Sequence, residues 1–204
     1  MDIGLYQLKY PARKLMGGIL PFMRDVDPNT VSFLMLPVGI TIAMSLHWAA
    51  AGRPEFYLAA MALTCLRMFL GTLDGLIAEH YQKRTAAGEI INRLTPELCD
   101  AMYLAALAVS RPSWFLWGVG VLAIAWLTTF TGLIGLAVKK PIQSVGPVGQ
   151  TDRLAALLIL ALTAYFSDSL GWGVDFIKIF LIWSVVGDII TIILRLKRNL
   201  REHK

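Results

Sequence analysis

Asp74 is a carboxylate in a part of the chain where ionised groups are rare, and it defines the first candidate site. It follows an apolar run, and Gly75 and Ala78 come directly after it. Small residues beside a carboxylate allow a neighbouring helix or a ligand to approach the backbone closely. An ionisable side chain inside an apolar segment is costly and usually marks function. Helix packing alone does not explain the carboxylate, so these three residues are a candidate binding site.

A second carboxylate, Asp100, ends a regular pattern. Gly88, Asn92, Pro96 and Asp100 recur at every fourth position, so they lie along one face of a helix. Two carboxylates on adjacent helices suit a hard cation such as Mg²⁺, with phosphate oxygens completing its coordination shell. The pattern therefore indicates either a metal and phosphate site that uses Asp74, Asn92 and Asp100, or a structural polar cluster. The residues alone leave both open.

For other ionisable residues in apolar surroundings we expect structural roles. Arg67 and Asp74 are seven residues apart, which is close to two helical turns, so they share a face and are expected to form or extend a buried pair. Asp188 and Arg195 have the same spacing, and we expect a structural tether between them. Glu97 points away from the face that carries Asp100, and we expect it to be solvated.

The composition indicates which elements position these residues. The chain of 204 residues is 56% apolar and 16% charged, with a mean hydropathy of +0.61. Soluble domains have about 45–50% apolar and about 25% charged residues. The apolar excess falls in long runs, which excludes a disordered chain, a disulfide scaffold and an ordinary water-soluble enzyme. Cys65 and Cys99 lie in such runs and are expected to be buried thiols. The sequence predicts an all-α integral membrane protein.

Six apolar segments are candidates for membrane spans, since a transmembrane helix needs roughly 20 mostly apolar residues. They are Val31–Ala50, Phe56–Ala78, Leu98–Val109 with a polar N-terminal extension, Ser113–Val138, Arg153–Phe166 and Trp172–Leu194. Residues 1–30 mix apolar and basic side chains and predict an amphipathic segment at the cytoplasmic membrane surface. The expected organisation is this segment, a six-helix transmembrane domain over 31–194 and a basic cytoplasmic tail over 195–204.

The positions of Lys and Arg predict the orientation. Fifteen of the 19 basic residues lie in the two terminal segments and in the second and fourth loops. The positive-inside rule places these regions in the cytoplasm. Termini on the same side require an even number of spans, which supports six. The net charge of +5 follows from this topology and from contact with the anionic lipid bilayer, so nucleic acid is not an expected partner.

Several motifs together resemble the CDP-alcohol phosphatidyltransferase family. The stretch from Leu73 to Ala78, with Gly88 and the helix after it, is similar to the family signature D-x-x-D-G-x-x-A-R followed by G-x-x-x-D-x-x-x-D. Three further matches are Asp27 to Ser32, similar to P-N-x-x-T/S, Gly146 to Arg153, similar to G-P-M-G-x-x-x-R, and Thr191 to Arg195, similar to T-x-x-x-R. The resemblance covers almost the whole chain, and six spans with cytoplasmic ends are the family architecture.

The resemblance implies an enzyme of phospholipid synthesis. Family members transfer a phosphatidyl or similar phosphate group from a CDP-diacylglycerol-like lipid to an alcohol and release CMP. Their signature aspartates hold Mg²⁺ or Mn²⁺. The resemblance also implies a homodimer, and the expected location is a bacterial inner membrane. The positions that it assigns to substrate contacts are Asn29, Gly75, Ala78, Gly88, Lys140, Arg153 and Arg195.

The chain departs from the signature at four positions. Aspartate is replaced by Gly71, Asn92 and Pro96, and arginine by Glu79. Only Asp74 remains in register. One interpretation is a rearranged site in which Asp74, Asn92 and Asp100 bind the metal, with Asp74 and Asp100 catalytic and Asp100 as the general base. The other is an inactive relative that binds CDP-lipid or nucleotide, or serves as a partner or regulatory subunit.

Overall fold

The computed structural model describes residues 16–200, and every regular element in this part of the chain is a helix. Six long helices are α2 (Pro28–Ala50), α3 (Glu55–His80), α4 (Ala86–Val109), α5 (Phe115–Leu133), α6 (Gln150–Leu170) and α7 (Phe176–Leu200). Short 3₁₀ segments are η2 (Leu20–Met23), η3 (Pro112–Trp114) and η4 (Ile134–Val138). The predicted all-α fold is confirmed.

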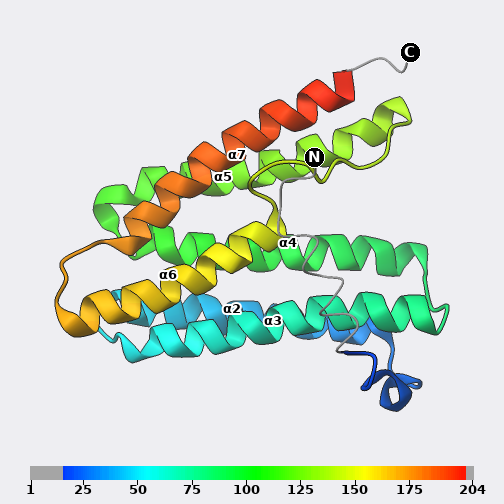
Figure 1. Cartoon of the computed structure of the whole chain (residues 1–204), viewed down its shortest axis with the longest axis horizontal. Helices are drawn as coiled ribbons and strands as arrows, with labels where there is room; N and C mark the ends of the chain where they lie inside the picture. Colours follow the sequence, from blue (N-terminus) through cyan, green and yellow to red (C-terminus); the bar gives the residue numbers. More distant parts are fainter. Residues whose placement is uncertain (1–15, 201–204) are drawn as a thin grey trace.

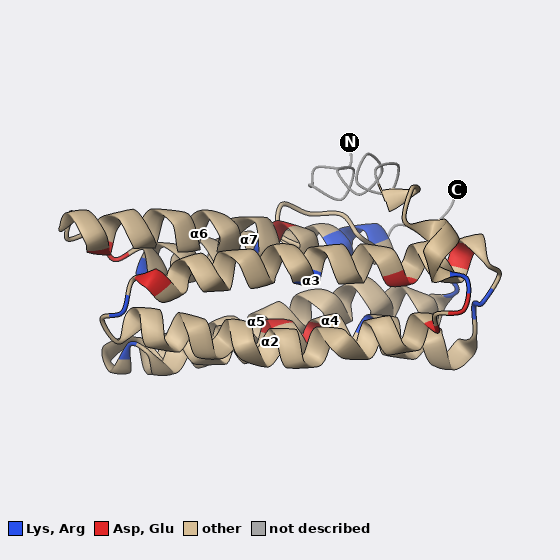
Figure 2. Ribbon diagram, turned by 90° about the horizontal axis from the view of Figure 1, so that it is seen from below, with Lys and Arg blue, Asp and Glu red and all other residues tan. Residues whose placement is uncertain are grey.

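The six long helices lie side by side along one axis (Figures 1 and 2), and the contacts between them close a ring. Helix α2 packs against α3 and α4, α3 against α6, α6 against α7, α7 against α5, and α5 against α4. An apolar core fills the half of the bundle near the loop between α2 and α3, and its buried members include Ile42, Leu46, Tyr57, Tyr103, Leu107, Leu157 and Phe180. The polar side chains are concentrated in the other half.

Five regions of the described chain are long and apolar enough to cross a membrane: Pro28–Ala50, Glu55–His80, Pro112–Val138, Gln150–Leu170 and Phe176–Leu200. Helix α4 is not among them, because Glu89, Arg93, Glu97 and Asp100 lie in its first four turns. The prediction of membrane-spanning helices is confirmed for five, and the sixth span stays a prediction. The outer surface carries many large apolar side chains. Cys65 lies on it, so only Cys99 is buried as expected.

The polar extension predicted for the third span belongs to the same helix as the apolar part, because α4 begins at Ala86 and continues through Pro96. One predicted boundary was wrong. Helix α7 runs to Leu200, and Arg195 is buried within it rather than in a tail that begins at 195. Of the predicted amphipathic segment, residues 1–15 lie outside the described residues, and η2 and the first turn of α2 occupy much of the remainder.

The segment between η4 and α6 turns back into the bundle before α6 begins (Figure 1). The Gln143 amide donates to the Gly132 carbonyl at 3.0 Å, and the Val148 amide donates to Thr191 Oγ1 at 3.1 Å. A capping interaction, in which the Gly149 amide donates to Asp152 Oδ2 at 2.9 Å, starts α6 at Gln150. The first turn of α6 therefore lies inside the bundle.

Basic and acidic positions are unevenly placed along the bundle (Figure 2). Most Lys and Arg positions gather at the end where α3 joins α4 and where α7 finishes, and acidic positions also occur halfway along the bundle. The basic end is the one that the sequence assigns to the cytoplasm. The candidate site residues lie in this half.

Candidate functional site

Most of the residues expected to bind substrate line one pocket between α2, α3 and α4, which we call the Asp74 pocket. Its volume is about 200 Å³. The expected residues that line it are Asn29, Asp74, Gly75, Ala78, Gly88 and Asn92. Ser32, Lys83, Arg84 and Glu89 line it as well. Residues from three separate stretches of the sequence are thus brought together in one pocket.

Local structure fixes the Asp74 carboxylate in this pocket. Asp27 caps α2 by accepting from the Asn29 amide at 3.0 Å, as is usual at a helix N-terminus. Ser32 Oγ, in the second turn of α2, donates to Asp74 Oδ2 at 2.6 Å. The Gly75 amide donates to Asp74 Oδ1 at 2.6 Å. The side chain is oriented by hydrogen bonds and is almost fully buried.

Gly88 keeps the opposite wall of the pocket open. Thr85 caps α4 by accepting from the Gly88 amide at 3.0 Å. A Cβ at Gly88 would lie 2.9 Å from Asn29 Oδ1 and 3.1 Å from Thr85 Oγ1. Both contacts are too close, so any larger residue would displace the Asn29 amide. The need for glycine here is steric and comes from the pocket.

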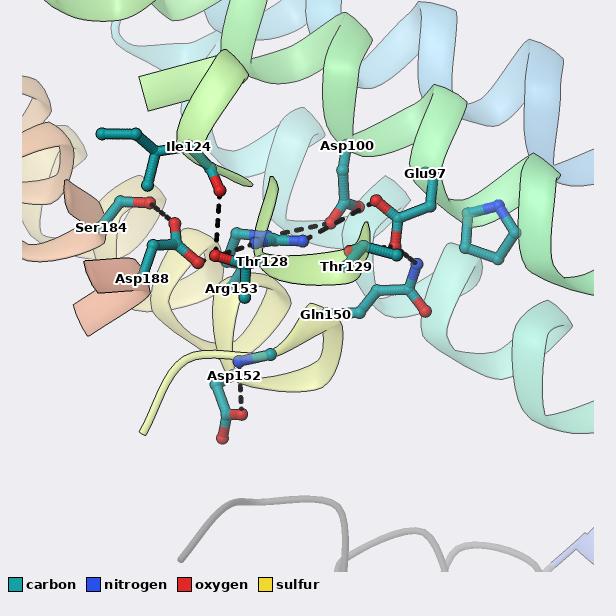
Figure 3. Close-up of polar contacts among 12 residues, drawn as sticks. Glu97, Asp100, Ile124, Thr128, Thr129, Gln150, Asp152, Arg153, Ser184 and Asp188 are labelled. Atoms are coloured by element: carbon teal, nitrogen blue, oxygen red, sulfur yellow. Dashed lines mark hydrogen bonds and ion pairs between the residues drawn. The ribbon is translucent and has the colours of Figure 1, made fainter. Parts of the chain in front are cut away.

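Asp100 lies outside the Asp74 pocket, in a buried network of charges (Figure 3). Its Oδ1 accepts from Arg67 Nη2 at 2.6 Å, and its Oδ2 accepts from Arg153 Nε at 3.2 Å. Arg153 Nη1 in turn donates to Asp188 Oδ1 at 3.2 Å. Each of these four side chains is at most 2% exposed. We call them the central charge network.

The network corrects three expectations. Asp100 has a guanidinium on each oxygen, so it is not placed with Asp74 and Asn92 as a metal ligand or as a general base. Arg67 pairs with Asp100 rather than with Asp74. The expected tether between Asp188 and Arg195 is also wrong, because Asp188 pairs with Arg153 and accepts from Ser184 Oγ at 3.1 Å.

A second pocket opens beside the network at the first turn of α6, and we call it the Arg153 pocket. Its volume is about 210 Å³ and both Arg153 and Arg195 line it. Arg195 is held by two backbone carbonyls, with Nε donating to Val145 at 3.0 Å and Nη1 to Thr128 at 2.5 Å. Lys140, also expected to bind substrate, does not line this pocket and donates to the Asn199 carbonyl at 2.6 Å.

Glu97 is a pocket residue that the sequence interpretation missed. Its Oε1 accepts from Thr129 Oγ1 at 3.0 Å and from Gln150 Nε2 at 3.2 Å, and its Oε2 lies 4.0 Å from Arg153 Nη2 (Figure 3). The side chain is only 18% exposed, so the expectation of a solvated residue was wrong. The available signal was its spacing of three residues from Asp100, which places both on the same side of α4.

The expected divalent cation does not fit the side chains that are present. Among residues 16–200, no three His, Cys, Asp or Glu side chains lie close enough together to hold a metal ion. In the Asp74 pocket the carboxylate already accepts from Ser32 and Gly75. Asn92 supplies a neutral amide, and Asp100 is bound by Arg67 and Arg153. These donors do not reproduce the cluster of carboxylates that the family signature uses for Mg²⁺ or Mn²⁺.

Comparison with known proteins supports the membrane assignment. No family model matches the chain. The chain is similar to the inner membrane protein YnbA of Escherichia coli (strain K12), with 26% identity over 192 residues. The aligned region covers 90% of this chain and 93% of YnbA. The similarity therefore extends over nearly the full length of both chains and agrees with the five membrane-spanning helices.

Proposed function

We propose that the protein binds a CDP-linked lipid in the Asp74 pocket and transfers its phosphatidyl group to an alcohol, with release of CMP. One observation carries the proposal. Residues 29, 74, 75, 78, 88 and 92, which the family resemblance selects from three stretches of sequence, line a single polar pocket. The pocket lies at the end of the bundle that is rich in Lys and Arg (Figure 2).

The two pockets suggest roles for the two substrates. The nucleotide and its phosphates lie in the Asp74 pocket, where small residues permit close approach to the backbone. The acceptor alcohol lies in the Arg153 pocket, where Arg195 is held at the rim by backbone carbonyls. In the transfer, the hydroxyl group of the acceptor extends from the Arg153 pocket to Asp74, which takes its proton. The alcohol oxygen forms a bond to the phosphatidyl phosphorus, and the bond from phosphorus to CMP breaks.

The second candidate function is binding without turnover, and the position of Asp100 favours it. Both of its oxygens are bound by guanidinium groups, and Pro96 cannot accept a proton. In this role the protein holds CDP-lipid or nucleotide and acts as a partner or regulatory subunit. Both candidates require the Asp74 pocket to bind CMP or CDP-diacylglycerol.

Location, orientation and assembly complete the proposal. A bacterial inner membrane with both chain ends in the cytoplasm follows from the basic loops and is consistent with the location in the name of YnbA. Six spans follow if α4 crosses with the other five helices. A homodimer is proposed from the family resemblance alone.

CMP release from CDP-diacylglycerol by the purified protein tests the transfer, across a panel of alcohols. Asp74→Asn should lower the rate by roughly 10²–10⁴-fold, the range usual for loss of a general base. Asp175→Asn is the matched control, because Asp175 lies at the opposite end of the bundle and pairs with Arg111. Equal rates for the wild type and Asp74→Asn would refute the catalytic assignment.

Calorimetry separates the two candidates when no alcohol supports release. If the wild-type protein binds CDP-diacylglycerol and Asp74→Asn does not, the result supports the second candidate function, binding without turnover. Absence of binding of both CMP and CDP-diacylglycerol at millimolar concentration would refute both candidates.

A further inference from the structure

A third cavity opens between α3 and α6 and has a different chemistry from the two pockets described above. Its volume is about 440 Å³. Its walls are mainly apolar and include Met35, Met68, Phe69 and Leu158. Polar groups line it as well, and they belong to Arg67, Thr72, Asn92, Gln150 and Thr151. A mainly apolar chamber with several polar groups is suited to an amphiphile rather than to a free nucleotide. We call it the Arg67 cavity.

Arg67 brings a positive charge to the middle of the bundle. It lies twelve residues after the start of α3, which is about 18 Å along the helix axis. If α3 spans the bilayer, this depth is close to the membrane centre, where a charged side chain is expensive and usually functional. The Arg67 side chain is 2% exposed.

The hydrogen bonds of Arg67 are incomplete. Nη2 donates to the Pro96 carbonyl at 2.7 Å and to Asp100 Oδ1 at 2.6 Å. Nε is buried and has no acceptor within the part of the chain that the structure describes. A buried N–H group without an acceptor destabilises the folded state, and a ligand oxygen that accepts from it removes this penalty.

Inside the cavity itself, no acidic side chain among residues 16–200 competes with a ligand for Arg67. Asp100 is shared between the guanidinium groups of Arg67 and Arg153. No Asp or Glu lines the Arg67 cavity. Three positions where the resemblance implies aspartate, occupied here by Gly71, Asn92 and Pro96, do line it. A wall that would be acidic according to the signature is therefore neutral, with one guanidinium beside it.

We propose that the Arg67 cavity binds the phosphate group of a membrane phospholipid directly, without a divalent cation. The Arg67 guanidinium donates to the phosphate oxygens, as guanidinium groups do well, and the apolar walls hold the acyl chains. The choice of a phospholipid as the ligand rests on the proposed function. The expectation that no divalent cation is needed rests on the side chains that line the cavity. Arg67 is then a phosphate-binding residue that donates through its unpartnered Nε.

Binding of dioctanoyl phosphatidic acid to the full chain in a detergent without phosphate, such as dodecyl maltoside, tests the inference. The affinity in EDTA should be within about 2-fold of that in Mg²⁺, since guanidinium binding needs no cation. Dioctanoylglycerol, which lacks the phosphate, should bind at least roughly 10-fold more weakly. Loss of binding in EDTA, or equal affinity for dioctanoylglycerol, would overturn the proposal. Displacement by millimolar inorganic phosphate would assign the site to free phosphate and overturn its lipid part.

Two variants act on the cavity in independent ways. Arg67→Gln should weaken binding by roughly 10- to 100-fold, the value of hydrogen bonds to a charged group. Arg53→Gln is the matched control, because Arg53 is exposed in the loop between α2 and α3. Thr72→Trp fills the cavity that Thr72 lines and should weaken binding if Arg67→Gln does not fold. Wild-type affinity in either folded variant would contradict the proposal.

Binding of CMP in the same detergent distinguishes this inference from the proposed function. If phosphatidic acid binds through Arg67 and CMP does not bind, the proposed function fails and the phosphate site stands. If CMP binds and phosphatidic acid requires Mg²⁺, the phosphate site fails and the Asp74 pocket stands.

Discussion

The central charge network predicts that Asp100→Asn strongly lowers the free energy of unfolding. The change preserves the size of the side chain and removes the one carboxylate that faces two guanidinium groups, at 2.6 Å from Arg67 and 3.2 Å from Arg153. Removing one partner of a buried ion pair costs about 3–5 kcal/mol. An interhelical hydrogen bond within a membrane averages only about 0.6 kcal/mol. A decrease of about 3 kcal/mol in the free energy of unfolding would therefore indicate an uncompensated charge rather than a missing hydrogen bond.

A second substitution should recover much of this loss. Arg67→Met in the Asp100→Asn protein removes one of the two guanidinium groups, and Arg153 keeps Asp188 as its partner at 3.2 Å. We expect the double variant to regain at least about 2 kcal/mol, because the excess positive charge is gone. The free-energy changes of the two substitutions would then not be additive, as expected for residues in contact.

Reversible unfolding by SDS in bicelles, followed by tryptophan fluorescence, measures these free energies. A loss of about 3 kcal/mol shifts the unfolding equilibrium by a factor of roughly 10². Asp175→Asn is the control for an exposed pair and should cost about 0.2–1 kcal/mol. If Asp100→Asn costs no more than Asp175→Asn, or if Arg67→Met recovers nothing, the interpretation of the network as a charge-balanced unit is refuted.

Three further predictions concern the pocket, the segment before α6 and the topology. Gly88→Ala should weaken CMP binding measured by calorimetry, because its Cβ would displace Asn29, whereas Gly120→Ala, which meets nothing within 4 Å, should not. Gly146→Ala should lower the free energy of unfolding by about 1–3 kcal/mol, since Gly146 has a φ of +131° that other residues adopt only with strain, and unchanged stability would argue against that geometry. In a Cys65→Ser background, His80→Cys should react with a membrane-impermeant thiol reagent only from the cytoplasmic side, and reaction only from the outside would reverse the assigned orientation.

The helical content could be predicted because its signal is local, whereas the grouping of residues in the Asp74 pocket depends on how α2, α3 and α4 pack. Apolar runs separated by turns predict helices of membrane length. The recurrence of Gly88 and Asn92 at every fourth position placed both on the face of α4 that lines the pocket. The end of α7 was predicted too early, because Arg195 lies in the helix and is buried by carbonyls of distant segments.

The partners of the buried charges could not be predicted from spacing. Asp100 pairs with residues 33 and 53 positions away in the sequence, and the choice depends on how the helices pack. Arg67 and Asp74 share a face of α3, yet each meets a different neighbouring helix. The depth of Arg153 depends on the segment before α6, whose folding back is set by contacts with α5 and α7.

The ion pair between α3 and α4 has a consequence for biosynthesis. Helix α4 is too polar to partition into lipid by itself, since its first four turns include Glu89, Arg93, Glu97 and Asp100. Helix α3 is made immediately before it and carries Arg67, the residue that neutralises Asp100. If α4 crosses the membrane, its insertion together with α3 would bring a compensated pair into the bilayer in place of two separate charges. The order of synthesis would then supply Asp100 with its partner before α4 enters the lipid.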